Sequence, residues 1–538
     1  MRQEAMQAPV MVGADVKERK AFDWRSYTPI FLVIIGSFLM LLGRIYLGGG
    51  RFITDGALMM LALASYLLAA VFYITNLYAP FPLAEKLGMW GTALGVFFNL
   101  SSWLVRWVAA YDRELAIFQQ QGRDLADMPW MFRYVPFANL YDLSLAFAFG
   151  AGIATLFVIR KPQFKIVAAL SLPLAAIILV LARFIGGEFI DLPPVLDSYW
   201  RPIHVGIASL SYGTALVCFA VAVLYLLKDG VKPQTMSIWS NIFAISVFAT
   251  ISKFSVFAPV TFGQYSVSLF SGDSRMALAL RADVPYVGWL LVASAVLLGA
   301  ASFCYLFYIS GKNKTLKSTG FYLMLAALFT QAAAIGTLVY QVRHLSDIAT
   351  KINPIQYTKF ATWMLQQQGV SEAQIQSMGS AQLTQIATSW IQSNGSTLHA
   401  SLNSNPVELS ALITAFIGTF FVIMFCIKTG RIRAALPSAD VLDALMYKLA
   451  GITFAGLALL LITGAVWANE SWGRYWGWDA KEVGALVAWL TYAAFLHSRI
   501  AKGWSGRKSA YFALIAFLFI IFTFLGVSYL LPGLHSYA

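Results

Sequence analysis

The chain has 538 residues, of which 59% are hydrophobic and only 12% are charged, and its formal net charge is +13. Soluble globular domains carry about 25% charged residues, so this composition excludes an ordinary soluble protein. The basic residues lie mainly in short loops between apolar runs, a pattern that orients membrane proteins. The positive charge therefore does not indicate a nucleic-acid partner.

Apolar runs recur along the chain, and each is long enough to cross the hydrocarbon core of a bilayer as a helix of about 20 residues. They predict an all-α polytopic integral membrane protein with about 13 transmembrane helices. We expect these helices at residues 28–47, 56–77, 88–110, 141–160, 166–186, 204–227, 238–258, 285–309, 318–341, 408–427, 446–466, 482–498 and 509–530.

Alternate loops between the predicted helices are rich in lysine and arginine, as in residues 160–165, 312–317 and 428–433, whereas the intervening loops are mixed or acidic. Basic loops mark the cytoplasmic side of a membrane protein. The alternation predicts a cytoplasmic tail at residues 1–27, with the N-terminus inside and the C-terminus outside. We expect a multi-pass protein of the bacterial inner (cytoplasmic) membrane, with its functional site on the periplasmic face.

The positions of the longer polar segments divide the chain into regions. Residues 28–227 are expected to form an N-terminal transmembrane region, residues 228–433 a second transmembrane region, and residues 434–538 a C-terminal core. The polar stretch 344–406 lies within the second region. Its Gln-, Ser- and Ala-rich runs predict a small helical insert on the outer face, and they do not indicate what the insert does.

Four tryptophans and one tyrosine gather in a single outer segment, WANESWGRYWGWDAK, at residues 467–481. They are Trp467, Trp472, Tyr475, Trp476 and Trp478. One interpretation is an interfacial aromatic belt, but a belt spreads such residues around the whole protein. A flat apolar macrocycle held at a water-facing surface needs broad aromatic faces. The concentration of indoles therefore favours a platform for a porphyrin.

Two of the five histidines lie at the ends of predicted helices on the same predicted side as this aromatic segment. His204 opens the sixth predicted helix, and His535 follows the last one. Either residue alone is more typical of a membrane interface than of a metal ligand. Imidazole is, however, a common axial ligand of haem iron, and two imidazoles give a six-coordinate, low-spin centre. Their shared side predicts that both ligate haem iron at the platform.

Asp479 and Glu482 resemble a pair of catalytic carboxylates, but their spacing fits a capping box at the start of the twelfth helix. We expect Asp479 to fix the angle at which the aromatic segment enters that helix, and so to belong to the haem-binding residues in a structural role.

His497 lies near the inner end of the twelfth predicted helix, in YAAFLHSR. An ionisable residue inside the membrane is a functional candidate, although an interfacial histidine is an equal alternative at this position. It is the third candidate ligand for haem iron.

The segment WANESWGRYWGWDAKEVGALVAWLTYAAFLHSR resembles the signature of the WWD-domain haem-handling proteins. It is most similar to the CcsA/ResC-type subunit of the system II cytochrome c synthase. NLYD at 139–142, SYWRPIHV at 198–205, LPSADVLDALMYK at 436–448 and GVSYLLPGLHSYA at the end support this resemblance.

The resemblance implies that His204 and His535 ligate haem iron on the outer face and that His497 is an intramembrane ligand on the route from inside. It also implies a second intramembrane histidine, which this family takes from a ResB/CcsB-type subunit or fused region. The first five predicted helices contain no histidine. We therefore expect a separate membrane partner.

The implied function is cytochrome c haem attachment, as a holocytochrome c synthase (haem lyase) active with the ResB/CcsB-type partner. Ferrous haem b is the bound substrate, and the acceptor is the CxxCH segment of an apocytochrome c. A thiol-reducing, thioredoxin-like protein is a further candidate partner. The alternatives are a haem exporter or chaperone-loading protein, and a permease for a small molecule without haem.

Three features depart from the family pattern. Ala480 replaces a proline that commonly follows the aspartate of the motif, which should weaken the helix cap modestly. Gly484 replaces an aromatic residue, which should loosen one edge of the platform. Residues 228–433 have no counterpart in a minimal member of the family.

Overall fold

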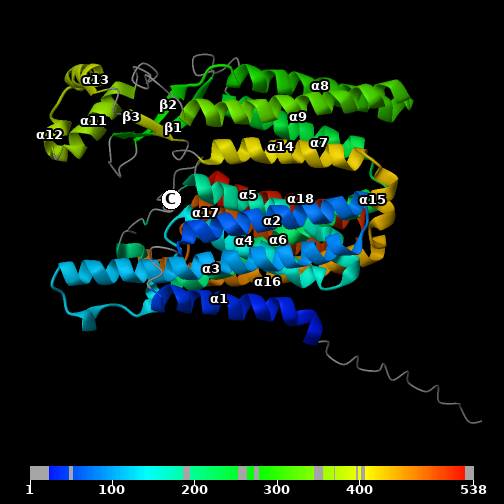
Figure 1. Cartoon of the computed structure of the whole chain (residues 1–538), viewed down its shortest axis with the longest axis horizontal. Helices are drawn as coiled ribbons and strands as arrows, with labels where there is room; N and C mark the ends of the chain where they lie inside the picture. Colours follow the sequence, from blue (N-terminus) through cyan, green and yellow to red (C-terminus); the bar gives the residue numbers. More distant parts are fainter. Residues whose placement is uncertain are drawn as a thin grey trace, which may run out of the picture.

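The computed structural model describes residues 24–47, 53–185, 189, 194–252, 263–271, 278–343, 356–368, 370–394, 398–401 and 406–527. Within these residues, thirteen helices are long and apolar enough to cross a membrane, each at a predicted position. The all-α polytopic membrane fold is therefore confirmed (Figure 1). His535, one of the two predicted outer ligands, lies outside the described residues.

The thirteen helices differ in length, and α3 and α16 extend well beyond the thickness of a bilayer. In chain order the helices are α1 (Thr28–Tyr46), α2 (Asp55–Tyr78), α3 (Pro82–Gln120), α4 (Leu140–Ile159), α5 (Ala168–Ile185), α6 (Trp200–Lys228), α7 (Pro233–Ser252), α8 (Val287–Gly311), α9 (Lys314–Arg343), α14 (Pro406–Cys426), α16 (Ala439–Trp472), α17 (Ala480–Lys502) and α18 (Arg507–Ile521).

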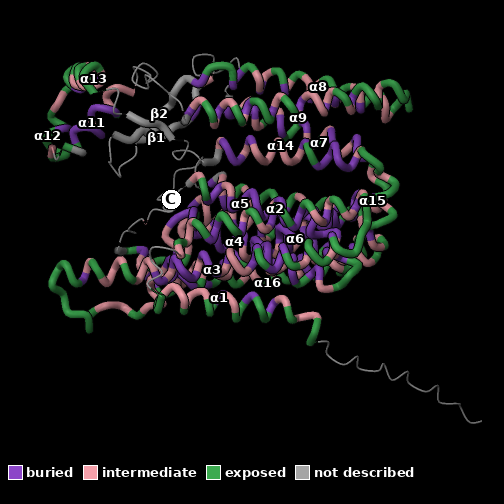
Figure 2. Tube along the Cα trace, viewed as in Figure 1, coloured by how far each residue is buried: buried purple, intermediate pink, exposed green. Residues whose placement is uncertain are grey.

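The helices form two groups, each around its own buried apolar core. The main bundle contains α1 to α6 and α16 to α18, while α7, α8, α9 and α14 form a second bundle beside it. Figure 1 shows the second bundle as a separate layer, with the short helix α15 (Thr429–Ala435) joining the layers at one end. Figure 2 shows that the buried residues concentrate within the main bundle.

The two ends of the bundle carry different structures. We call the end that holds the first residues of α4, α6 and α17 the outer end, following the predicted orientation, and the opposite end the inner end. The outer insert contributes the helices α11 (Tyr357–Gln367), α12 (Glu372–Gln376) and α13 (Ser380–Asn394), as expected. Figure 1 places them at the outer end.

A small antiparallel sheet accompanies these helices and was not predicted. Its strands are β1 (Gln264–Ser271), β2 (Leu278–Asp283) and β3 (Leu398–Ser401), in the order β2-β1-β3. β3 comes from the insert expected to be wholly helical, so that expectation was incomplete. Four residues are too few to display the alternation of a strand, and β3 pairs with β1 more than 100 positions earlier in the chain.

α4 and α6 pack with their backbones in direct contact, because glycines face each other at the crossing. A Cβ atom added to Gly213 would lie 2.2 Å from the carbonyl carbon of Gly150, and one added to Gly150 would lie 2.7 Å from the Ser209 oxygen. Only glycine fits at Gly213. This contact fixes the height at which α6 presents its first turns, including His204, beside α4.

A buried ion-pair cluster joins α2, α3 and α4 toward the outer end. The Arg106 side chain is fully buried; its Nε donates to Asp142 Oδ1, and its Nη1 lies 3.2 Å from Asp55 Oδ2. The Tyr141 hydroxyl donates to the same Asp55 oxygen at 3.0 Å. Asp142 Oδ2 also accepts from the Ala138 N–H at 3.0 Å, so the cluster holds the turn that precedes α4.

Candidate functional site

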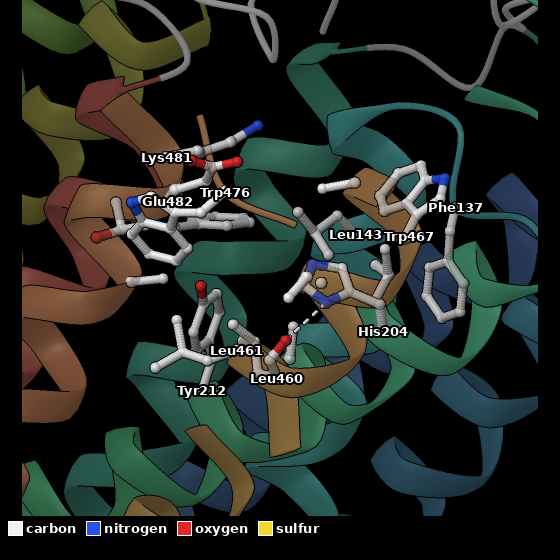
Figure 3. A pocket seen from close by; sticks show the side chains of 18 of the residues that line it. Phe137, Leu143, His204, Tyr212, Leu460, Leu461, Trp467, Trp476, Lys481 and Glu482 are labelled. Carbon is white, nitrogen blue, oxygen red and sulfur yellow. Dashed lines mark hydrogen bonds between the residues drawn. The ribbon is translucent and has the colours of Figure 1, made fainter. Parts of the chain in front are cut away.

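A cavity at the outer end of the main bundle is lined by the beginnings of α4, α6 and α17 and by the end of α16. It contains five of the residues predicted from the sequence. These are His204, Trp467, Trp472, Tyr475 and Trp476. The segments that supply them are more than 250 residues apart in the chain, and the helix packing brings them together (Figure 3).

His204 is held in one orientation by the backbone of α16. Its Nδ1 lies 3.0 Å from the Leu460 carbonyl oxygen and 3.4 Å from Thr463 Oγ1. A carbonyl oxygen only accepts, so Nδ1 carries the hydrogen and donates, and the lone pair resides on Nε2. Metal-ligating histidines commonly have this arrangement, in which the second nitrogen is anchored to a carbonyl.

A glycine on α16 makes room for the imidazole. A Cβ atom added to Gly464 would lie 2.8 Å from Cε1 and 3.1 Å from Nδ1 of His204. Real Cβ contacts do not occur below 3.0 Å. The ring therefore occupies the space that any larger residue at position 464 would fill.

Trp467 forms the wall next to His204. The two ring centroids are 5.7 Å apart, and the ring planes are inclined by 50°. Trp467 is 6% exposed, and among the described residues its buried Nε1 has no hydrogen-bond acceptor. Buried indole N–H groups usually have a partner, so this donor is available for an acceptor atom of a ligand.

The loop between α16 and α17 carries the remaining aromatic residues, and they face in two directions. Trp476 lines the cavity and packs edge-on against Trp478, with ring centroids 5.8 Å apart. Trp478 is 73% exposed and does not line the cavity, and Tyr475 lines it while 62% exposed. Trp478 has φ of 57°, a conformation unusual for a bulky residue and most common at functional sites.

The predicted capping box at the start of α17 is present. The Asp479 side chain accepts from the Lys481 N–H at 3.0 Å, while Glu482 Oε2 accepts from the N–H groups of Asp479 at 3.2 Å and Gly477 at 2.8 Å. Asp479 is buried and does not line the cavity. Its geometry is that of a helix cap, and Glu482 extends the cap into the loop.

We expect Asp479→Ala to destabilise the protein by about 0.5–2 kcal/mol, because the cap of α17 is lost. The loop should also become more sensitive to trypsin at the exposed Arg474, which limited proteolysis of the purified protein would detect. Ser371→Ala breaks the equivalent capping box of α12 in the outer insert and is the matched control. Equal cleavage at Arg474 in both variants would contradict a role for Asp479 in holding the loop.

Several cavity residues were not singled out from the sequence. Phe137, Leu140 and Leu143 come from the start of α4 and the turn before it, and only the NLYD resemblance pointed to this segment. Tyr212 and Phe524 also line the cavity, and each lies edge-on to the buried Phe147. These aromatic residues fall inside apolar runs, where the sequence does not distinguish a cavity wall from the core.

Lys481 was also missed as a cavity residue. Among the described residues that line the cavity it is the only lysine or arginine. Arg474, in the loop between α16 and α17, is exposed and does not line the cavity. Figure 3 shows Lys481 beside Glu482 and Trp476, on the opposite side of the cavity from His204.

Gly484 has a packing role rather than a place at the platform edge. A Cβ atom added there would lie 2.7 Å from Thr523 Oγ1, just beyond α18 in the π-helical turn η10 (Phe522–Gly526). The missing side chain therefore lets the end of α18 approach α17.

The cavity fits part of a porphyrin. Its volume is about 150 Å³, below the roughly 300–1,000 Å³ of pockets that enclose a small molecule. The donor set suits one edge of the macrocycle: an oriented imidazole, indole faces, an unpaired indole N–H and one ammonium group.

His497 lies far from this cavity. It is exposed on α17, sixteen positions after Lys481, which corresponds to roughly 24 Å along a helix. Leu490 and Ala494 are exposed on the same side of α17. The structure therefore brings His204 to the aromatic cavity and places His497 on a separate surface near the inner end.

Fold and site together define a polytopic membrane protein with a histidine-containing aromatic cavity at one end of its bundle. The family model described as "Cytochrome C assembly protein" matches residues 137–274 and 287–535. The chain belongs to this family. The matched ranges include the cavity helices and run through most of residues 228–433, for which the sequence resemblance offers no counterpart.

Curated relatives match a shorter part of the chain. The "Cytochrome c biogenesis protein CcsA" of Chlamydomonas reinhardtii is 41% identical over 151 residues, 27% of this chain and 41% of that protein. The proteins of the same name from Gloeothece citriformis and Synechocystis sp. are each 52% identical over 102 residues, 19% of this chain. The chain thus matches less than half of the length of each of these relatives.

Proposed function

We propose that this chain presents ferrous haem b on the outer face of the membrane for attachment to the CxxCH segment of an apocytochrome c. One observation carries the proposal: His204 lines the tryptophan-rich cavity, and its Nδ1 is anchored to the Leu460 carbonyl. Family membership and the names of the relatives support haem handling in cytochrome c biogenesis.

In this proposal the protein acts by holding the haem in a fixed position and orientation for the CxxCH segment. Nε2 of His204 would ligate the iron, and His535, which lies outside the described residues, would supply the second imidazole. Trp467, Trp472 and Trp476 limit rotation of the macrocycle, while Lys481 and the Trp467 N–H offer partners for its carboxylates. A well-oriented pair of reactants needs no general acid or base to gain a large rate advantage.

The bond-forming step is an addition and needs no external oxidant. Each cysteine S–H of the CxxCH segment adds across one vinyl group: a C–S bond forms, and the hydrogen goes to the neighbouring vinyl carbon. The histidine of the same segment replaces His204 or His535 at the iron. Both cysteines must be in the thiol form, and the proposed thioredoxin-like partner would keep them so.

The proposal is tested by the absorption spectrum of the purified protein, coexpressed with a ResB/CcsB-type partner. The wild type should show reduced, low-spin haem, and the His204→Ala/His535→Ala variant should lose it. His399→Ala, on β3 of the outer sheet, is the control and should retain the spectrum. A wild-type protein that contains no haem would contradict the proposal and favour the alternative function of a small-molecule permease.

Attachment is distinguished from hand-off by a second readout. Coexpression with an apocytochrome c should give haem that stays on the cytochrome after denaturation, because the thioether bonds are covalent. Haem bound by the wild type without such a product would favour the alternative of a haem exporter or chaperone-loading protein.

His497 is proposed as an intramembrane ligand for haem on its way from the inner side. Because His497 is exposed on α17, a histidine of a ResB/CcsB-type partner could approach the same haem iron. We expect His497→Ala to lower the haem content of the outer site in cells several-fold, measured by spectroscopy of isolated membranes. The same variant, purified and given haem directly, should still bind it.

Leu490→Ala, on the same exposed side of α17, is the matched control. Unchanged haem loading of the outer site in His497→Ala would contradict a haem route through His497.

A further inference from the structure

A second cavity lies between α4, α6 and α16 toward the inner end, and no part of the proposed function uses it. Its volume is about 550 Å³, within the roughly 300–1,000 Å³ of sites that hold small molecules. The groove also involves the 3-10 turn η4 (Pro162–Val167). It lies on the same three helices as the aromatic cavity but uses different residues of them.

The walls of the groove are apolar and open toward the lipid-facing surface. Phe164 and Leu449 are buried at its base, while Phe157, Leu210 and Ile452 are exposed along its sides. Exposed apolar side chains on membrane-spanning helices contact acyl chains. The groove residues of α16 run from Val441 to Ile452, roughly 16 Å along the helix, a length that suits a hydrocarbon chain.

Two lysines, Lys161 and Lys448, give the groove a positive charge at its inner end. Neither forms an ion pair within the described residues, and no aspartate or glutamate lines the groove there. Asp440, two turns before Lys448 on α16, forms no ion pair with either lysine.

Three other basic side chains near the inner end are already paired. Lys165 Nζ lies 2.6 Å from Glu85, Arg499 Nη1 donates to Asp443 at 2.8 Å, and Arg507 donates to Asp229 at 2.6 Å. The two groove lysines, by contrast, form no ion pair within the described residues and lie beside an apolar channel.

We propose that this groove binds an anionic phospholipid of the inner leaflet, with an acyl chain in the channel and the headgroup at Lys161 and Lys448. The leaflet follows from the predicted orientation of the chain. The described residues that line the groove include no imidazole, thiol or thioether, so haem, another anionic amphiphile, would lack its usual axial ligands there.

The test is native mass spectrometry of the full-length protein after delipidation, titrated with phosphatidylglycerol and with phosphatidylcholine of identical acyl chains. A basic side chain near an anionic headgroup contributes about 1 kcal/mol, so two lysines predict a preference of roughly 30-fold for phosphatidylglycerol. Lys161→Gln/Lys448→Gln should abolish this preference. Lys86→Gln/Lys314→Gln, at exposed inner-end lysines outside the groove, should retain it.

A second variant tests the acyl-chain part of the site. Ala154→Phe fills the groove from α4, seven positions outward of Lys161, and should remove one bound lipid irrespective of its headgroup. No headgroup preference in the wild type, or a wild-type preference in the double lysine variant, would overturn the proposal. Loss of bound phosphatidylglycerol when a ResB/CcsB-type partner is added would also overturn it, since the groove would then be a protein interface.

Discussion

Replacing Gly464 with alanine is expected to weaken haem binding roughly 10- to 100-fold, the range found when a group that orients a metal ligand is altered. The new Cβ atom would lie 2.8 Å from Cε1 of His204 and would turn the imidazole away from the Leu460 carbonyl. The measurement is the haem content of the purified protein, read from its absorption spectrum.

Three further experiments test whether this loss of haem binding acts through His204. Gly451→Ala is the control, because Gly451 lies on the same helix and a Cβ atom there meets nothing within 4 Å. The Gly464→Ala/His204→Ala double variant should bind haem no worse than His204→Ala alone, since both changes remove one interaction. Exogenous imidazole should partly restore haem to His204→Ala. Additive losses in the double variant would show that Gly464 acts elsewhere.

Removing the positive charge of the buried cluster should give the largest loss of stability. Arg106→Met leaves Asp142 fully buried and without its cation, and breaking a buried ion pair costs about 3–5 kcal/mol. The measurement is the thermal unfolding midpoint in detergent, followed by circular dichroism.

Two controls test whether the loss of stability comes from leaving a buried charge without its partner. Lys165→Met breaks the partly exposed pair with Glu85 and should cost no more than about 1 kcal/mol. Arg106→Met/Asp142→Asn should recover part of the loss, because the second change removes the uncompensated charge. A midpoint for Arg106→Met equal to that of Lys165→Met would contradict a stabilising role for the cluster.

The membrane fold could be predicted because apolar length alone defines a transmembrane helix. All thirteen helices match, and the outer insert contains the expected helices. The sheet could not be predicted, since β3 is short and depends on a distant partner for its hydrogen bonds. The Arg106–Asp142 pair was also missed, because each residue occurs singly within or beside an apolar run.

The candidate site was only partly accessible from the sequence. The density of tryptophans indicated the segment, and His204 indeed lines the same cavity as Trp467 and Trp476. The sequence could not separate Trp476, which faces the cavity, from Trp478, which faces outward, because both belong to one loop. The pairing of His204 with His535 and the role of His497 remain predictions.

The glycine contact between α4 and α6 has a consequence for how a ligand enters the cavity. With no side chains between the two backbones at Gly150 and Gly213, these helices can neither slide nor separate without losing their closest packing. One side of the cavity, including Leu143 and His204, is thus a fixed wall. If the proposed haem site widens for its ligand, we expect the movement on the α17 side, where Trp478 has φ of 57° and the loop is held by a helix cap.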